Sequence, residues 1–331
     1  MNQGEAMLKV AIYGLGRWGN RLVDSVQASE KIRFVKGISR DPAKHKEFSQ
    51  KTGIKVVSSY GRVLKDPEID AVMLATPHTL HMKQIIQAAK AGKHVFVEKP
   101  MTLTRKSAEK AVEACKAAGV TLGVGFNRRF QPSFVEMMNR IRAGQIGKVL
   151  HIEGAHSGPT GYGLKPDTWR SSRVEAPGGG MTARGVHTLD AMIQIGGLVT
   201  SVYAFSDNRN LPAGIDMDDT TTMLLKFSSG VTGYLSALFT TGELYRVHVF
   251  GTKGWLELRG DTELTFRGVE GAPEKITLPA ADKEKAELEA FADAVAAKKP
   301  FAVPAEDAIN GAAVLEAIVA SAAKGKAVAI K

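Results

Sequence analysis

Residues 8–19 read Leu8-Lys9-Val10-Ala11-Ile12-Tyr13-Gly14-Leu15-Gly16-Arg17-Trp18-Gly19. The first six form a mostly apolar run typical of a buried strand, and the last six have the spacing G-x-G-x-x-G. A helical pattern follows, which puts the glycines at a strand-to-helix turn. There the first glycine permits a tight turn, the second lets a pyrophosphate approach the backbone, and the third allows close helix packing. These residues predict a dinucleotide-binding unit; a glycine-rich turn without a ligand is the alternative.

The rest of the first 126 residues alternates short apolar segments with helical ones. We expect strands at 8–13, 34–39, 55–58, 71–76, 94–98 and 121–125, and helices at 17–29, 42–50, 60–65, 81–91 and 105–118. Such alternation is typical of a parallel sheet with helices on both faces. The sequence therefore predicts an N-terminal Rossmann domain with a parallel sheet over residues 1–126.

The second part of the chain has a different pattern. A strand is expected at 148–156, and a glycine-rich segment at 177–180 precedes a helix at 182–195. Strands with period-two alternation follow, joined by a hairpin turn at 251–254, and two helices come near the end. This pattern indicates an α+β domain over 127–331 with a large, open, mostly antiparallel sheet. Its last helices are candidates to pack back on the first domain.

Composition narrows the class of protein. With 331 residues the chain exceeds what one core usually supports, so two domains are expected. No apolar run approaches the roughly 20 residues of a membrane span, and residues 1–7 lack a signal-peptide core, so we expect a cytoplasmic protein. The single cysteine, Cys115, is expected to be buried. The net charge of +10 is scattered, which favours an anionic ligand such as a dinucleotide over nucleic acid.

A lysine follows the apolar run His94-Val95-Phe96-Val97 in the sequence Glu98-Lys99-Pro100. An unpaired ammonium is costly to bury, so a buried strand has no structural need for it. In open α/β sheets ligands lie at the carboxyl ends of the strands, where Lys99 would stand. Desolvation there would lower its pKa towards the range used in proton transfer. The alternative is a lysine that extends to solvent before a turn.

The residues after the second strand bear on the choice of cofactor. NAD enzymes usually have an acid there that binds the ribose hydroxyls, whereas this chain has Ser39 and Arg40. A hydroxyl and a guanidinium suit a 2′-phosphate, so NADP(H) is favoured over NAD(H). Asp41, followed by Pro42, fits best as a helix N-cap. If Asp41 instead turns towards the ribose, NAD would be accepted.

Several further motifs together resemble one family. Besides the glycine turn and Glu-Lys-Pro they are, in chain order, Thr76-Pro77-His78 with His81, Gly125-Phe126-Asn127-Arg128-Arg129-Phe130, Gly144-Gln145-Ile146-Gly147, Trp169-Arg170, Gly178-Gly179-Gly180 and Gly185-Val186-His187 with Asp190. Over nearly its whole length the chain resembles the glucose–fructose oxidoreductase, inositol dehydrogenase and rhizopine-catabolism (Gfo/Idh/MocA) family.

The resemblance implies hydride transfer between nicotinamide C4 and a hydroxyl or ketone carbon of a sugar, sugar derivative or cyclitol. By this resemblance Lys99 contacts the reacting oxygen and His187 acts as the general acid/base. The Lys99–Pro100 peptide is expected to be cis. The residues implied to bind the cofactor are Gly14, Gly16, Arg17, Trp18, Gly19, Ser39, Arg40, Thr76, Pro77, His78, His81, Glu98, Lys99, Asn127, Trp169 and Arg170. Those implied to bind substrate are Lys99, Arg128, Trp169 and His187. The open sheet would join copies into a homodimer or homotetramer.

One position departs from the family pattern. Many members have an aspartate four residues before the histidine, where this chain has Ala183. Asp190 could partner His187, although in the family that position looks structural. The departure leaves open a histidine–lysine enzyme, a shifted substrate class, or a non-catalytic dinucleotide-binding sensor or scaffold. No metal site is predicted, because His78, His81 and His156 lack partners at ligand spacing.

Overall fold

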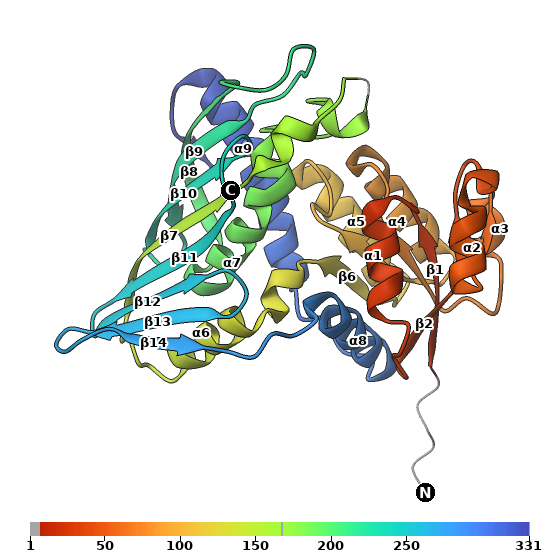
Figure 1. The fold of residues 1–331 in the computed structure, drawn as a ribbon, viewed down its shortest axis with the longest axis horizontal. Helices are drawn as coiled ribbons and strands as arrows, with labels where there is room; N and C mark the ends of the chain where they lie inside the picture. Colours follow the sequence, from red (N-terminus) through yellow and green to blue (C-terminus); the bar gives the residue numbers. More distant parts are fainter. Residues whose placement is uncertain (1–6, 167, 331) are drawn as a thin grey trace, which may run out of the picture. The chain divides into compact units, whose positions relative to one another are not determined.

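The computed structural model describes residues 7–166 and 168–330, which divide into two compact units (Figure 1). The first unit comprises the chain up to Thr102 together with Lys106–Phe126 and Asp282–Ala305. The second comprises Leu103–Arg105, Asn127–Ala281 and the chain from Glu306 onward. No helix in the described residues is long and apolar enough to cross a membrane.

The first unit is built on a six-stranded, all-parallel sheet in the order β3-β2-β1-β4-β5-β6. Its strands are β1 (Leu8–Tyr13), β2 (Ile32–Ile38), β3 (Lys55–Val57), β4 (Ala71–Leu74), β5 (His94–Glu98) and β6 (Leu122–Gly125). Its helices are α1 (Arg17–Ser25), α2 (Lys46–Thr52), α3 (Tyr60–Leu64), α4 (His81–Lys90), α5 (Arg105–Ala117) and α8 (Lys283–Ala296). All four residues of β4 are buried, as expected for a strand covered on both faces. The predicted Rossmann architecture is confirmed.

Helix α8 belongs to the first unit although it follows most of the second in sequence. Its Phe291 ring packs edge-on against Phe96 of β5, with 5.4 Å between the centroids. Gly123 of β6 makes room for this ring, because a Cβ there would lie 2.8 Å from Phe291. Helix α8 is thus held against the sheet by the Phe291 ring, which packs over Gly123.

The second unit has a nine-stranded sheet in the order β14-β13-β12-β11-β7-β10-β9-β8-β15. The strands are β7 (Val149–Ser157), β8 (Val199–Asp207), β9 (Thr220–Phe227), β10 (Thr232–Leu238), β11 (Leu244–Gly251), β12 (Gly254–Arg259), β13 (Glu263–Gly268), β14 (Glu274–Thr277) and β15 (Val328–Ala329). All pairs are antiparallel except β7 with β10, which confirms the predicted mostly antiparallel sheet. Helices α6 (Pro132–Arg142), α7 (Val186–Gly196) and α9 (Ala305–Lys324) cover one face of it (Figure 1).

Some predicted elements differ in detail. The helix expected at 42–50 is a 3₁₀ turn, Pro42–His45, followed by α2. Asp41 has the N-cap position, but its side chain makes no capping hydrogen bond and instead pairs with Lys44 at 3.5 Å. The helix expected at 182–195 begins with a π-helical turn, Met181–Gly185, before α7. Such turns are rare, and a single sequence gives no signal for them.

Candidate active site

The glycine turn after β1 has the geometry that a pyrophosphate requires. Gly14 has φ of +108°, and a Cβ on it would lie 2.3 Å from the carbonyl oxygen of Ala75. A Cβ on Gly19 would lie 1.9 Å from the Gly14 carbonyl oxygen, so only glycine lets α1 begin this close to the turn. No atom lies within 4 Å of a Cβ position on Gly16, which is exposed at the N-cap of α1. The open space over Gly16, at the N-terminus of α1, fits a dinucleotide phosphate.

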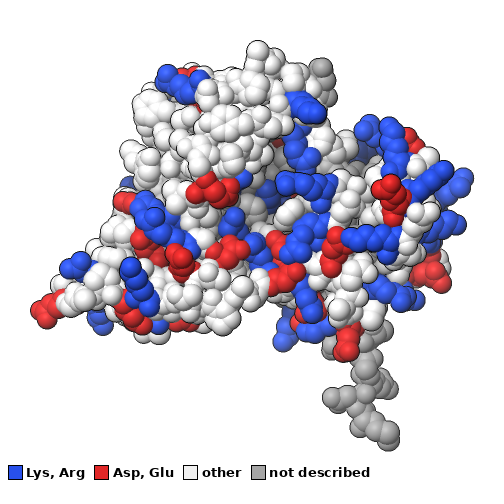
Figure 2. All heavy atoms as spheres, viewed as in Figure 1, with Lys and Arg blue, Asp and Glu red and all other residues white. Residues whose placement is uncertain are grey.

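In the segment after β2, the Ser39 hydroxyl is hydrogen-bonded and the Arg40 guanidinium is exposed. The Ser39 hydroxyl contacts the His45 ring nitrogen at 2.9 Å and accepts a hydrogen bond from the Asp41 N–H at 3.2 Å. Arg40 is exposed. Figure 2 shows Lys and Arg gathered over this part of the first unit, where exposed cations include Arg40, Lys44, Lys46, Arg62 and Lys65. This surface is suited to an anionic group.

His81 connects the segments that follow β4 and β5. Its ring is fully buried, with Nε2 3.0 Å from the Thr76 carbonyl oxygen and Nδ1 3.1 Å from the Pro100 carbonyl oxygen. The Thr76 hydroxyl donates to Gln84 at 2.6 Å. These bonds hold Thr76 and Pro100 at the carboxyl edge of the sheet. His81 therefore supports this edge through its ring, and contact with a cofactor stays a prediction for it.

Glu98 and Lys99 come at the end of β5, as predicted, and the Lys99–Pro100 peptide is cis, which confirms that prediction. The Glu98 carboxyl group is buried, and its Oε1 has no hydrogen-bond partner among the described residues. Burial raises the pKa of Glu98 to about 7, against the opposing effects of the Lys99 charge and the Trp18 N–H. Lys99 itself is only partly buried. The structure thus presents a lysine beside a carboxyl group that is easily protonated.

In the second unit His187 lies in the first turn of α7 and is buried. This helix crosses β7 at Gly154, where a Cβ would lie 2.5 Å from the Thr188 methyl group. The close crossing brings the His187 ring to the His156 ring, with 6.0 Å between the centroids. Sequence reasoning gave His156 no role, because no local motif marks it.

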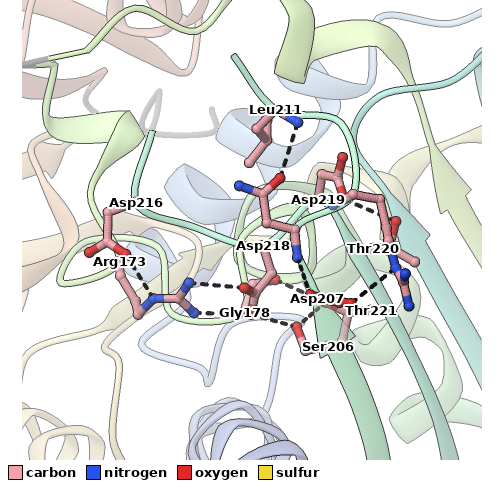
Figure 3. Close-up of polar contacts among 12 residues, drawn as sticks. Arg173, Gly178, Ser206, Asp207, Leu211, Asp216, Asp218, Asp219, Thr220 and Thr221 are labelled. Atoms are coloured by element: carbon pink, nitrogen blue, oxygen red, sulfur yellow. Dashed lines mark hydrogen bonds and ion pairs between the residues drawn. The ribbon is translucent and has the colours of Figure 1, made fainter. Parts of the chain in front are cut away.

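The glycine segment before α7 is anchored by a polar network (Figure 3). Arg173 makes two bonds to Asp218, at 2.9 and 3.0 Å, and the Ser206 hydroxyl donates to Asp218 at 2.8 Å. Burial alone would raise the pKa of Asp218, but these bonds outweigh it and lower the pKa. The Thr221 hydroxyl donates to the Gly178 carbonyl oxygen at 3.2 Å. The network ties the chain that leads into the His187 helix to β8 and β9.

Asp190 forms an ion pair with Arg129. Arg129 binds it through two hydrogen bonds of 2.7 Å and also binds Asp307 of α9 at 2.9 Å. Arg129 and Asp190 are both buried. Asp190 is therefore part of a buried ion pair with Arg129, and a partnership with His187 stays a prediction. Asp307 was not predicted, because it is 178 residues from Arg129.

Ala183 and Arg184 occupy the turn before His187. Ala183 packs against an apolar cluster formed by Ala176, Ile215, Met217 and Phe239. The next residue, Arg184, has polar partners instead. Arg184 binds the Thr160 hydroxyl at 2.7 Å and Glu243 at 2.6 Å. At the position expected for an acid, this chain has an apolar contact.

Arg128 and Arg170 both stack on aromatic rings. The Arg128 Cζ lies 3.9 Å from the Tyr245 ring centroid, and the Arg170 Cζ lies 4.1 Å from that of Trp169. Arg128 also binds Asp261 at 3.2 Å. Within the described part of the chain, no group of three His, Cys, Asp or Glu side chains could hold a metal ion.

A parallel sheet with this glycine turn, joined to an α+β unit with an open sheet, defines a dinucleotide-binding protein of the Rossmann class. A family model described as "Oxidoreductase family, NAD-binding Rossmann fold" matches residues 8–126, and a model of the GFO/IDH/MocA C-terminal domain matches residues 134–257. The chain belongs to the Gfo/Idh/MocA oxidoreductase family.

Named relatives are similar over most of their length. The scyllo-inositol 2-dehydrogenase (NAD(+)) of Bacillus subtilis is 34% identical, covering 76% of this chain and 73% of that protein. The D-xylose 1-dehydrogenase (NADP(+)) 2 of Haloferax volcanii is 30% identical, covering 93% and 94%. The crystal structure of the aldose-aldose oxidoreductase from Caulobacter crescentus, complexed with glycerol, superimposes with a TM-score of 0.88 at 28% identity, covering 98% and 99%.

Proposed function

We propose that the chain is an NAD(P)-dependent dehydrogenase or reductase that acts on the CH–OH group of a sugar, sugar derivative or cyclitol. The observation that carries the proposal is the placement of Lys99 at the carboxyl end of β5, in a sheet whose glycine turn fits a dinucleotide. The names of the relatives support it, since they include an inositol dehydrogenase and a xylose dehydrogenase.

The proposed chemistry divides between two side chains. When bound, the nicotinamide cofactor supplies the carbon that accepts or donates the hydride. His187 takes the proton of the substrate hydroxyl, and it returns the proton in the reverse direction. The Lys99 ammonium stabilises the negative charge that develops on the reacting oxygen. Arg128 and Trp169 are proposed to bind the substrate.

The cofactor is proposed to lie along the carboxyl edge of the first sheet. Gly16 and the N-terminus of α1 would bind the pyrophosphate, while Thr76 and its neighbours would line the edge. We propose a preference for NADP(H), because Arg40 is exposed after β2 and the Asp41 carboxylate is paired with Lys44. We also propose a cytoplasmic protein that needs no metal and does not act on nucleic acid.

The test measures cofactor binding and turnover separately. Quenching of Trp fluorescence, with Trp18 in the first turn of α1, would report NADPH and NADH binding. Absorbance at 340 nm would then follow turnover on a panel of aldoses, anhydrosugars and inositols. We expect Lys99→Met to lower turnover by about a thousandfold or more without weakening cofactor binding. The exposed lysine variant Lys90→Met is the matched control and should leave both unchanged.

A second candidate is a dinucleotide-binding sensor or scaffold without turnover. The observation that favours it is the apolar packing of Ala183 where the family usually has an acid. Tight cofactor binding with no turnover on the whole panel would support this candidate and contradict the dehydrogenase.

A further inference from the structure

One buried carboxyl group at the end of β5 takes no part in the chemistry proposed above. Glu98 is 6% exposed and directly precedes Lys99. Opposite it on β6 is Gly125, where a Cβ would lie 2.9 Å from the Glu98 Oε1 and 3.1 Å from its Oε2. A side chain at Gly125 would displace the carboxyl group. The fold therefore makes space for an acid inside the edge of the sheet.

The surroundings of Glu98 leave its carboxyl group able to hold or to release a proton. Burial has the largest effect and raises its pKa to about 7. The Lys99 charge and the Trp18 indole N–H oppose this effect, although the indole makes no hydrogen bond of ordinary geometry. The charge of Glu284 on α8 adds to it and is itself paired with Arg21 at 2.6 Å. Both forms of Glu98 are therefore populated near neutral pH.

Glu98 is close to the site proposed for the cofactor. Trp18, whose indole acts on the carboxyl group, lies in the first turn of α1, where the pyrophosphate is proposed to bind. The nicotinamide ring of a dinucleotide is one ribose beyond the pyrophosphate, and ligands of such sheets lie at the carboxyl ends of the strands. Lys99 is proposed to contact the oxygen that reacts beside this ring. The inference rests on the proposed function for this placement.

The two oxidation states of a nicotinamide cofactor differ in charge, since the oxidised ring is positive and the reduced ring is neutral. We propose that Glu98 senses this charge: it releases its proton to solvent when the oxidised cofactor binds and keeps it when the reduced cofactor binds. The carboxylate that remains stabilises a positive ring at a buried site, whereas a neutral ring offers no such gain. Binding of the oxidised cofactor therefore weakens as pH falls through about 7, and low pH favours the reduced complex.

The first experiment counts protons released by the full chain without substrate. NADP⁺ and NADPH are titrated calorimetrically at pH 7 in two buffers of different ionisation enthalpy, or NAD⁺ and NADH if that pair binds more tightly. The phosphates are the same in both forms of a cofactor, so their titration cancels in the comparison. We expect the oxidised form to release about 0.3 to 0.5 proton per site more than the reduced form. In Glu98→Gln this difference should vanish.

The pH dependence of binding gives a second readout. Between pH 6 and pH 8 the affinity for the oxidised form, relative to the reduced form, should rise about fivefold or more in the wild type and stay level in Glu98→Gln. Glu30→Gln, at an exposed position, and Glu287→Gln, at a second buried carboxyl group, are the controls and should behave as the wild type. Lys99→Met should still release the proton; loss of the release there would make Lys99 its source and overturn the proposal.

Infrared difference spectra of the wild type need no variant and should show the loss of a protonated carboxyl band on binding of the oxidised cofactor only. Equal proton release with both forms, or a difference that survives in Glu98→Gln, would overturn the proposal. If the difference is present but no sugar or cyclitol is turned over, the proposed dehydrogenase fails while the role of Glu98 stands. Turnover without the difference has the opposite meaning, and failure to bind either cofactor would overturn both.

Discussion

At the residue scale, the fold changes the protonation of the Glu98 carboxyl group. Burial raises its pKa from the ordinary value of 4.5 to about 7. At pH values between about 4.5 and about 7, the folded protein therefore binds this proton more tightly than the unfolded chain does. The free energy of unfolding therefore falls as pH rises from about 4.5 to about 7, by roughly 2 to 3 kcal/mol from this group.

Glu98→Gln should remove this dependence. The amide has nearly the same shape and stays neutral, so between pH 5 and pH 8 the variant should gain roughly 2 to 3 kcal/mol relative to the wild type. Urea denaturation at the two pH values measures the difference. Glu30→Gln, at an exposed position, should show no such gain. Equal pH dependence in the wild type and Glu98→Gln would contradict the prediction.

Asp190→Asn tests the structural role of the buried ion pair. The variant removes the Asp190 charge from Arg129, whose side chain is 4% exposed, and leaves its ion pair with Asp307 in place. We expect a loss of about 3 kcal/mol in the free energy of unfolding. Asp293→Asn removes the exposed pair with Lys31 and should cost less than about 1 kcal/mol. A loss of turnover without any loss of stability would instead return Asp190 to the chemistry of His187.

At the scale of elements, local sequence patterns predicted much of the secondary structure but little of the contact between distant segments. The strand at 94–98 was predicted with its observed bounds because its apolar run is continuous and ends in a charged pair. The π-helical turn before α7 and the short strand β15 were not predicted, since both depend on contacts rather than on periodicity. The His156–His187 contact joins a strand to a helix 31 positions later through the close crossing at Gly154, and local sequence reasoning cannot see such a contact.

Gly179→Ala tests how the glycine segment supports α7. Gly179 has φ of +53°, and a Cβ on it would lie 1.6 Å from the Asp218 carbonyl oxygen. The methyl group must displace the network around Arg173 and Asp218, so we expect a loss of about 2 kcal/mol or more in stability and lower turnover. Cofactor binding, which we assign to the first unit, should persist. A Cβ on Gly163 would have no atom within 4 Å, so Gly163→Ala should leave stability, turnover and cofactor binding unchanged.

At the scale of the whole molecule, one face of the nine-stranded sheet carries exposed apolar side chains. Leu224 is 59% exposed, and it stands opposite Tyr203 on β8 and Tyr234 on β10. Phe205, 64% exposed, packs edge-on against Tyr203. A contiguous apolar patch on the open face of a sheet is typical of a protein interface. We propose that a second copy of the chain covers this patch in a homodimer or homotetramer.

Leu224→Arg should therefore disrupt the oligomer. A charge placed at the centre of the patch must be desolvated when two copies pack together, and it faces an arginine or apolar groups on the partner copy. Size-exclusion chromatography with light scattering should show an oligomer for the wild type and a smaller species for the variant. Val174→Arg, at an equally exposed apolar residue outside the sheet, should keep the wild-type mass. A monomeric wild type, or an unchanged mass for Leu224→Arg, would mean that the exposed face serves another purpose than self-association.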